Sequence, residues 1–100
     1  MLTKEKVIKT IEKERPHLAA EFNVKKIGLF GSFARERQTS NSDIDIIVEF
    51  SKPIGFKFLE FCDYLEKKLG KKVDVLTPAG IRAIRLKHIA KDIRSNIIYV

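Results

Sequence analysis

The segment Asp43–Phe50 (DIDIIVEF) constrains the fold of this chain more than any other stretch. Its side chains alternate with the period of two that a β-strand imposes, because successive residues point to opposite faces of a sheet. The alternation places Asp43, Asp45, Ile47 and Glu49 on one face and the apolar Ile44, Ile46, Val48 and Phe50 on the other. We expect the apolar face to pack against helices, so the chain must form a sheet with at least one covered side.

The remaining elements are expected from apolar periodicity, capping residues and turn residues. They are a helix capped by Thr3 and broken or restarted at Pro16, a strand over Val24–Phe30, a short helix over Ser32–Glu36, a turn over Gln38–Ser42, a loop over Ser51–Gly55, a helix over Phe56–Leu69 capped by Gly70, a strand over Lys72–Leu76, a helix over Ala79–Arg94, and a terminal strand or extended tail over Asn96–Val100. The order α-β-α-β-α-β-α predicts an α+β fold, a small mixed β-sheet with covering helices, in a single domain over residues 1–100.

Composition narrows the class of partner. The net charge of +7 favours a polyanionic partner such as a nucleoside triphosphate, a nucleic acid or an acidic protein face, although a solvated basic surface is an equal alternative. The single Cys62 excludes an internal disulfide and is expected to be a small buried apolar residue. The N-terminus has no unbroken apolar stretch of the kind found in a signal peptide, and no segment approaches the length of a membrane span. We therefore expect a cytoplasmic protein without a membrane partner.

Asp43 and Asp45 are held side by side on the strand, with side-chain origins roughly 6.5–7 Å apart. Asp74 stands between Val73 and Val75 in another expected strand, and falls on the same face as Asp45 if the two strands are neighbours. Three carboxylates on one face repel each other unless a cation compensates, and their hard oxygens select Mg²⁺ or Mn²⁺. The alternative is that these acids are solvated residues at strand ends.

Gly31 and Ser32 stand where a strand gives way to a helix, about a dozen residues before the carboxylates. Glycine allows a ligand to approach the backbone closely, and free N–H groups at a helix start attract anions. The Ser32 hydroxyl adds a donor, and Arg35 lies one turn further on, within reach of a phosphate. A plain strand-to-helix turn capped by Ser32 is the alternative interpretation.

The pair Gly31-Ser32, ten intervening residues, then Asp43-Ile-Asp45 and a later apolar-flanked Asp74 resembles the nucleotidyltransferase superfamily that includes DNA polymerase beta. The segments KKIGLFGSFAR and VDVLTP are similar to those of the minimal nucleotidyltransferase group, and the resemblance covers nearly the whole chain. The resemblance implies that Asp43 and Asp45 bind Mg²⁺ and the triphosphate, and that Asp74 helps to hold the metal and to activate the attacking hydroxyl.

The resemblance also implies that Gly31 and Ser32 cradle the β- and γ-phosphates, with Arg35 and Ser42 completing the nucleotide-binding set. One position departs from the family pattern. The family usually has glycine after the arginine of its FARG motif, whereas this chain has Glu36. An anion there stands close to the phosphate loop, which puts the shape of the loop or its activity in doubt.

Members of the minimal group are often antitoxins of HEPN-type RNase toxins, and transfer AMP from ATP onto a toxin tyrosine. The resemblance therefore implies a Mg²⁺-dependent protein adenylyltransferase with ATP as substrate and a HEPN toxin as partner. A second hypothesis is an antitoxin with a weak or inactive site that neutralises its partner by forming a complex. A third, supported only by the positive charge, is nucleotide transfer to RNA or a small molecule.

Overall fold

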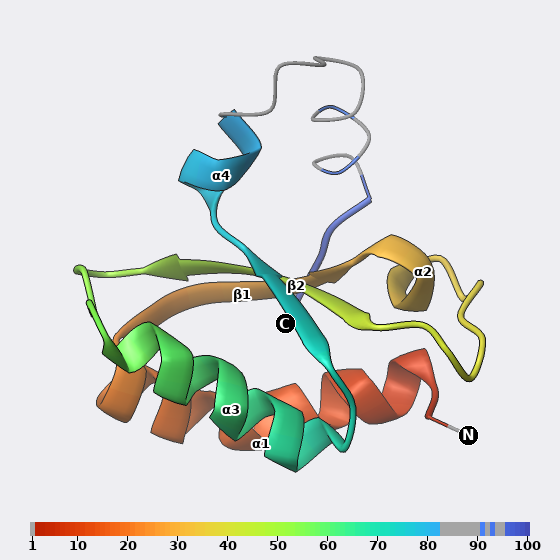
Figure 1. Cartoon of the computed structure of the whole chain (residues 1–100), viewed down its shortest axis with the longest axis horizontal. Coiled ribbons are helices and arrows are strands. Elements are labelled where there is room, and N and C mark those ends of the chain that lie inside the picture. Colours follow the sequence, from red (N-terminus) through yellow and green to blue (C-terminus); the bar gives the residue numbers. More distant parts are fainter. Residues whose placement is uncertain (1, 83–90, 92, 94–95) are drawn as a thin grey trace.

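A four-stranded sheet with helices on both sides forms the computed structural model, which describes residues 2–82, 91, 93 and 96–100 (Figure 1). The elements in chain order are α1 (Lys4–Phe22), β1 (Val24–Phe30), α2 (Gly31–Ala34), β2 (Ile44–Phe50), α3 (Lys57–Leu69), β3 (Val73–Leu76), α4 (Pro78–Arg82) and β4 (Ile98–Tyr99). The segment Asn96–Val100, left open between a strand and a tail, therefore contains a short strand.

The sheet is mixed, with the strand order β3-β2-β1-β4. Strand β1 runs antiparallel to both β2 and β4, whereas β2 and β3 are parallel. The parallel pair is connected through α3, because parallel neighbours require a crossover rather than a hairpin. The architecture confirms the predicted α+β fold with a small mixed sheet.

Helices α1 and α3 cover one face of the sheet (Figure 1). The buried side chains of this layer are Val7, Ile11, Leu18 and Phe22 from α1, Ile27 and Leu29 from β1, Phe33 from α2, Ile44, Ile46 and Val48 from β2, Phe61, Leu65 and Leu69 from α3, and Val73 from β3. As predicted from the alternation, the apolar face of β2 packs against helices. Burying one such side chain contributes about 1.5–3 kcal/mol, so this layer fixes the orientation of β2.

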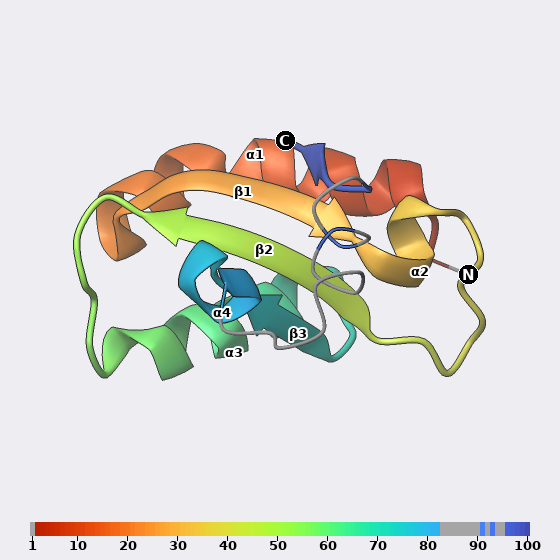
Figure 2. The same cartoon turned by 90° about the horizontal axis from the view of Figure 1, so that it is seen from above.

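The opposite face of the sheet is only partly covered. Seen from above, α4 lies over part of β2 and β3 (Figure 2). A second, smaller apolar cluster lies on this face, where Ile47 is packed by Phe30, Leu76, Ile93 and Ile97. We call this side of the sheet the open face; it carries Asp45, Ile47 and Glu49 of β2.

The predicted break at Pro16 is wrong, because α1 continues through this residue to Phe22. Pro16 is exposed, whereas the buried Ile11 and Leu18 lie on either side of it along the helix. Both belong to one apolar stripe that faces the sheet. Packing of that stripe outweighs the local cost of proline, about 3 kcal/mol in a helix interior.

Two further expectations are adjusted by the structure, and a third falls mostly outside the residues that it describes. The short helix α2 ends at Ala34 and does not reach Glu36. Cys62 is half-buried against the main core, and burial raises the pKa of its thiol. Most of the helix expected over Ala79–Arg94 lies outside the described residues, and its described beginning is α4.

No helix in the described part of the chain combines the length and apolarity needed to cross a membrane.

Candidate active site

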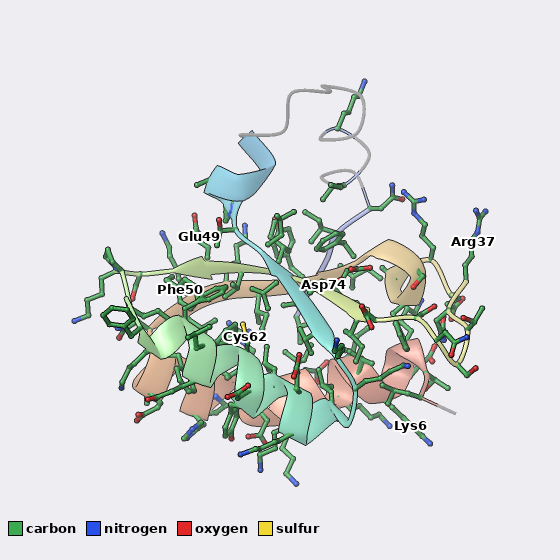
Figure 3. All side chains as sticks on the ribbon, viewed as in Figure 1. Lys6, Arg37, Glu49, Phe50, Cys62 and Asp74 are labelled. Carbon is green, nitrogen blue, oxygen red and sulfur yellow. The ribbon has the colours of Figure 1, made fainter. Side chains whose placement is uncertain are left out.

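Strand pairing brings two of the predicted carboxylates together. In the parallel register of β2 and β3, Asp45 lies directly opposite Asp74. The backbone N–H of Ile44 donates to the carbonyl of Lys72 at 3.0 Å, which extends the ladder toward Asp43. Asp43 and Asp74 are exposed, and Asp45 is half-buried (Figure 3 labels Asp74). The condition set by the sequence, that the two strands be neighbours, is met.

Burial and the two other acids affect the ionisation of Asp45. Its pKa is raised to about 6, first by burial and then by the negative charges of Asp74 and Asp43. Both effects disfavour the charged carboxylate. A cation bound among these acids would remove the repulsion, so the charge pattern suits a positively charged ligand.

Gly31 follows β1 directly and lies against Asp45. Its backbone is left-handed, with φ +73°, and a Cβ built on it would lie 2.8 Å from Asp45 Cγ and closer still to Oδ2. The left-handed conformation favours glycine, and a side chain here would displace the Asp45 carboxylate. The register agrees, because Phe30 pairs with Asp45 across β1 and β2. The phosphate-loop glycine and the second carboxylate, predicted from separate motifs, are in direct contact.

Ser32 does not cap α2. The residue at the N-cap position is Phe30, which provides no side-chain hydrogen bond. Within the described residues, no hydrogen bond to the Ser32 hydroxyl is formed, so this group is left for another partner. The plain-turn alternative, in which Ser32 serves as the cap, is wrong in that detail.

Glu36 occupies the position that ends α2. Arg37 N–H donates to the Ser32 carbonyl at 2.8 Å, and Glu36 N–H donates to the Phe33 carbonyl at 3.3 Å. These two bonds make a Schellman motif, whose left-handed residue is usually glycine. Glu36 adopts that conformation with φ +57°. The geometry explains why glycine is usual here, which the sequence alone did not.

The Glu36 carboxylate is drawn toward α1. Lys4 Nζ lies 3.5 Å from Glu36 Oε1, in an ion pair of partly exposed side chains. The negative charge of Glu36, which was expected to affect the phosphate loop, is therefore paired with Lys4 of α1. Arg35, by contrast, is exposed, and its own N–H donates to the Gly31 carbonyl at 3.1 Å.

Ser42 stabilises the loop that leads into β2. Its hydroxyl accepts a hydrogen bond from Thr39 N–H at 2.9 Å. In the same loop, the Ser40 carbonyl accepts a bond from Lys71 Nζ at 2.9 Å. These contacts connect the segment before Asp43 with the segment before Asp74, and they give Ser42 a structural role beside its predicted place in the nucleotide-binding set.

Within the described ranges, no three Asp, Glu, His or Cys side chains are already gathered around a point that could hold a metal ion. The donor set nevertheless fits a hard divalent cation, because its ligands are carboxylate oxygens. Crowding at Asp45 supplies a reason for such a cation to bind.

The sequence prediction missed residues further along the open face. A cavity there is lined by Lys26, Ile47, Glu49, Pro78 and Tyr99. Figure 3 shows Glu49 on the α4 side of the sheet, and Phe50 on the α3 side. The sequence carried one signal for this cavity, since Glu49 continues the alternation of Asp43 and Asp45. It carried none for Tyr99, because the last residues could have been a tail.

A small mixed sheet that pairs Asp45 with Asp74 beside Gly31 is the arrangement expected of a nucleotidyltransferase domain. The family model for the nucleotidyltransferase domain matches residues 5–100, and this chain belongs to that family. A relative in Methanocaldococcus jannaschii, named "putative protein adenylyltransferase", is 41% identical over the full length of both chains. Protein adenylyltransferase MntA of Thermococcus cleftensis is 35% identical over all of this chain and 98% of its own.

Solved structures share the fold. One described as a "putative minimal nucleotidyltransferase" has a TM-score of 0.72 and 21% identity, and covers 97% of this chain and 95% of that one. A toxin-antitoxin structure with AMP-PNP has a TM-score of 0.62 and 24% identity, over 98% and 72% of the two chains. The resemblance inferred from the sequence, and with it the fold class, is confirmed.

Proposed function

We propose that this chain is a Mg²⁺-dependent protein adenylyltransferase that transfers AMP from ATP to a tyrosine hydroxyl of a partner HEPN toxin, and so acts as its antitoxin. The observation that carries the proposal is the contact of Gly31 with Asp45, together with the pairing of Asp45 and Asp74 across β2 and β3. Relatives named protein adenylyltransferase, and solved structures of the same fold described as toxin-antitoxin complexes, support it. A cytoplasmic location stays a prediction.

The proposed roles follow from where the side chains lie. Gly31 lets the triphosphate approach the backbone beside Asp45, and the unpaired Ser32 hydroxyl and the exposed Arg35 are available to its phosphate oxygens. Asp43, Asp45 and Asp74 would hold Mg²⁺, with Mn²⁺ as the alternative. When bound, the cation neutralises charge on the triphosphate and on the departing diphosphate.

Asp74 is the residue that we propose meets the acceptor. Strand β3 is an edge of the sheet, and Asp74 on it is exposed, so a partner protein can reach this carboxylate. In the proposed step Asp74 takes the proton from the acceptor hydroxyl. The hydroxyl oxygen forms a bond to the α-phosphorus, the bond from that phosphorus to the diphosphate breaks, and diphosphate leaves.

The alternative function is neutralisation of the partner by complex formation, with little or no transfer. Glu36 is the observation that favours it, because a strained non-glycine residue ends the helix after the phosphate loop. Against it stands the complete carboxylate set. Transfer to RNA or a small molecule has only the net charge of +7 in its support.

The two antitoxin functions are separated by incubating the protein with labelled ATP, Mg²⁺ and the candidate toxin. We expect label on a toxin tyrosine, and its loss in Asp43→Asn and Asp45→Asn. Toxin neutralised equally well by both variants, with no label on it in the wild type, would replace this proposal with the complex-formation alternative.

A further inference from the structure

Strand β3 forms an edge of the sheet. It pairs with β2 on one side, and no described strand pairs with it on the other (Figure 2). An edge strand presents backbone N–H and C=O groups that can pair with another chain. Many proteins bind an extended segment of a partner at such an edge, where the segment adds a strand to the sheet. This edge adjoins the proposed site, because β3 carries Asp74.

The backbone groups of β3 alternate in direction. The Lys72 carbonyl faces β2 and accepts a hydrogen bond from Ile44 N–H at 3.0 Å. Val73 N–H faces the opposite way and donates to Glu66 Oε2 on α3 at 3.1 Å. Because the direction alternates along a strand, Val75 also faces away from β2. Three groups are left for an added strand within the described part of the chain: the Val73 carbonyl, and the N–H and the carbonyl of Val75.

These three groups match a segment that runs parallel to β3. In that arrangement one residue of the segment donates its N–H to the Val73 carbonyl and accepts from Val75 N–H, so that it lies opposite Asp74. Neighbouring strands are about 4.8 Å apart, and residues opposite each other share a face. The side chain of this residue therefore stands beside Asp74 on the open face. An antiparallel segment would also need Val73 N–H, which already donates to Glu66.

The side of α3 next to this edge carries exposed apolar side chains. Leu59 is two turns before Glu66, so it lies on the helix stripe that faces the β3 edge. Leu59 is 68% exposed, and Phe56, three residues earlier, is 95% exposed. A strand added to β3 would direct alternate side chains toward this stripe, just as Val73 and Val75 are directed toward the main core. The added strand would therefore bury apolar surface as well as pair its backbone.

Charge distinguishes the two ends of the edge. Lys72 directly precedes β3, and Lys67 lies in the last turn of α3; both are exposed. Neither forms an ion pair with another described residue. In the parallel direction, the N-terminal part of an added segment lies at this end of β3. An acidic residue in that part of the segment is complementary to these lysines.

We propose that the β3 edge binds an extended segment of the protein acceptor as an added strand, with the acceptor tyrosine opposite Asp74. The segment has apolar residues on both sides of the tyrosine, which pack toward Leu59, and an acidic residue before them, which lies near Lys72. The proposal rests on the proposed nucleotidyl transfer. It adds to that function the way in which the acceptor is presented and the sequence pattern that is selected.

Strand addition is tested first by binding, without transfer. The probe is a peptide with valine on both sides of one tyrosine and glutamate before them, and the control peptide has serine in place of both valines. Amide hydrogen exchange is followed by NMR on the full chain at saturating peptide. We expect the valine peptide, and not the serine peptide, to slow exchange of the Val75 amide by several-fold, because this N–H becomes hydrogen-bonded.

Leu59→Asp tests the apolar contact during transfer to the candidate toxin. We expect the KM for the protein acceptor to rise by about tenfold, the effect of one lost leucine contact, with kcat and the KM for ATP unchanged. Leu59→Met keeps an apolar side chain and should keep the wild-type KM. Ala20→Asp is the matched control, because it makes the same change of charge at an exposed position of α1 and should leave the KM unchanged.

Two sets of results separate this inference from the proposed function. An unprotected Val75 amide and an unchanged acceptor KM in Leu59→Asp, while transfer still depends on Asp45, would overturn this inference alone. Protection of Val75 by the valine peptide, with no transfer to any acceptor, would support the docking edge and overturn the proposed function.

Discussion

Gly31 and Asp45 show how single residues couple the two halves of the site. The left-handed backbone of Gly31 lies so close to Asp45 that a Cβ there would force the Asp45 side chain to move. A glycine that a sequence pattern assigns to phosphate binding is thus also required by packing against an acid of the same site. At Glu36 the opposite holds. Its left-handed backbone favours glycine, but the position is occupied by a charged residue that pairs with Lys4.

Gly31→Ala should therefore be far more damaging than a typical glycine substitution. Gly70→Ala is the matched control, because Gly70 has the same φ of +73° but a Cβ added there would meet no atom within 4 Å. We expect Gly70→Ala to lower the free energy of unfolding by about 1 kcal/mol. Gly31→Ala should cost about 1–3 kcal/mol more, from overpacking against Asp45, and should reduce AMP transfer. Equal losses of stability in denaturant unfolding would contradict the contact.

Replacement of Glu36 tests the strain at the end of α2. Glu36→Gly and Glu36→Ala both remove the ion pair with Lys4, but only glycine relieves the left-handed backbone. We expect the glycine variant to be the more stable of the two by about 1 kcal/mol in urea unfolding. An alanine variant as stable as the glycine variant would show that residue 36 is not held left-handed in solution.

At the scale of elements, the parallel pairing of β2 and β3 brings Asp45 and Asp74 together. Each strand contributes an apolar face to the main core, and the pairing then places Asp45 opposite Asp74 on the other face. The repulsion between these acids is a consequence of the register. It is offset by the packing of Ile44, Ile46 and Val73 beneath them.

This register predicts an unusual pH dependence for the metal-free protein. The pKa of Asp45 in the folded state, about 6, lies above its ordinary value of 3.8. Between these two values the folded state holds a proton that the unfolded state has lost, so the contribution of Asp45 to stability falls as pH rises toward 6 and is lowest above it. The Tm difference between Asp45→Asn and the wild type should therefore grow from pH 4 to pH 7. A difference that is constant with pH would contradict the raised pKa of Asp45.

Much of this arrangement could be predicted from short-range patterns. The two faces of β2 and the positions of the strands follow from alternation and turn residues, which are local properties. The pairing partner of β2 and the contact of Gly31 with Asp45 depend on tertiary structure, so they could be stated only as conditions. The continuity of α1 through Pro16 was mispredicted for the same reason, because packing of Ile11 and Leu18 outweighs a local preference.

Two features could not be predicted from the sequence: the backbone conformation of Glu36 and the cavity on the open face. The sequence around Glu36 does not predict a left-handed backbone, because that conformation is usually predicted from a glycine and residue 36 is not a glycine. The cavity depends on Tyr99, whose strand adds to the sheet through only two paired residues. Such short pairings leave no periodic pattern to detect.

At the scale of the whole molecule, the two faces of the sheet have different roles. One face supplies stability through α1 and α3 (Figure 1). The other carries Asp45 at one end of β2 and the cavity lined by Glu49 at the other end. Because β3 is an edge strand, Asp74 stands where a partner protein can approach. The layout is consistent with a catalyst whose acceptor is presented by another molecule.

The most direct test of the central claim is the rate of AMP transfer to the proposed partner toxin by Asp74→Asn, with Asp63→Asn as the control. Asp63 is an exposed aspartate on α3, and the substitution there makes the same change of charge. Loss of a proton acceptor at the reacting hydroxyl should lower kcat by about 10²–10⁴-fold in Asp74→Asn and leave Asp63→Asn at the wild-type rate. A correctly folded Asp74→Asn protein that transfers AMP as fast as the wild type would contradict the claim that the β2–β3 pair forms one catalytic site.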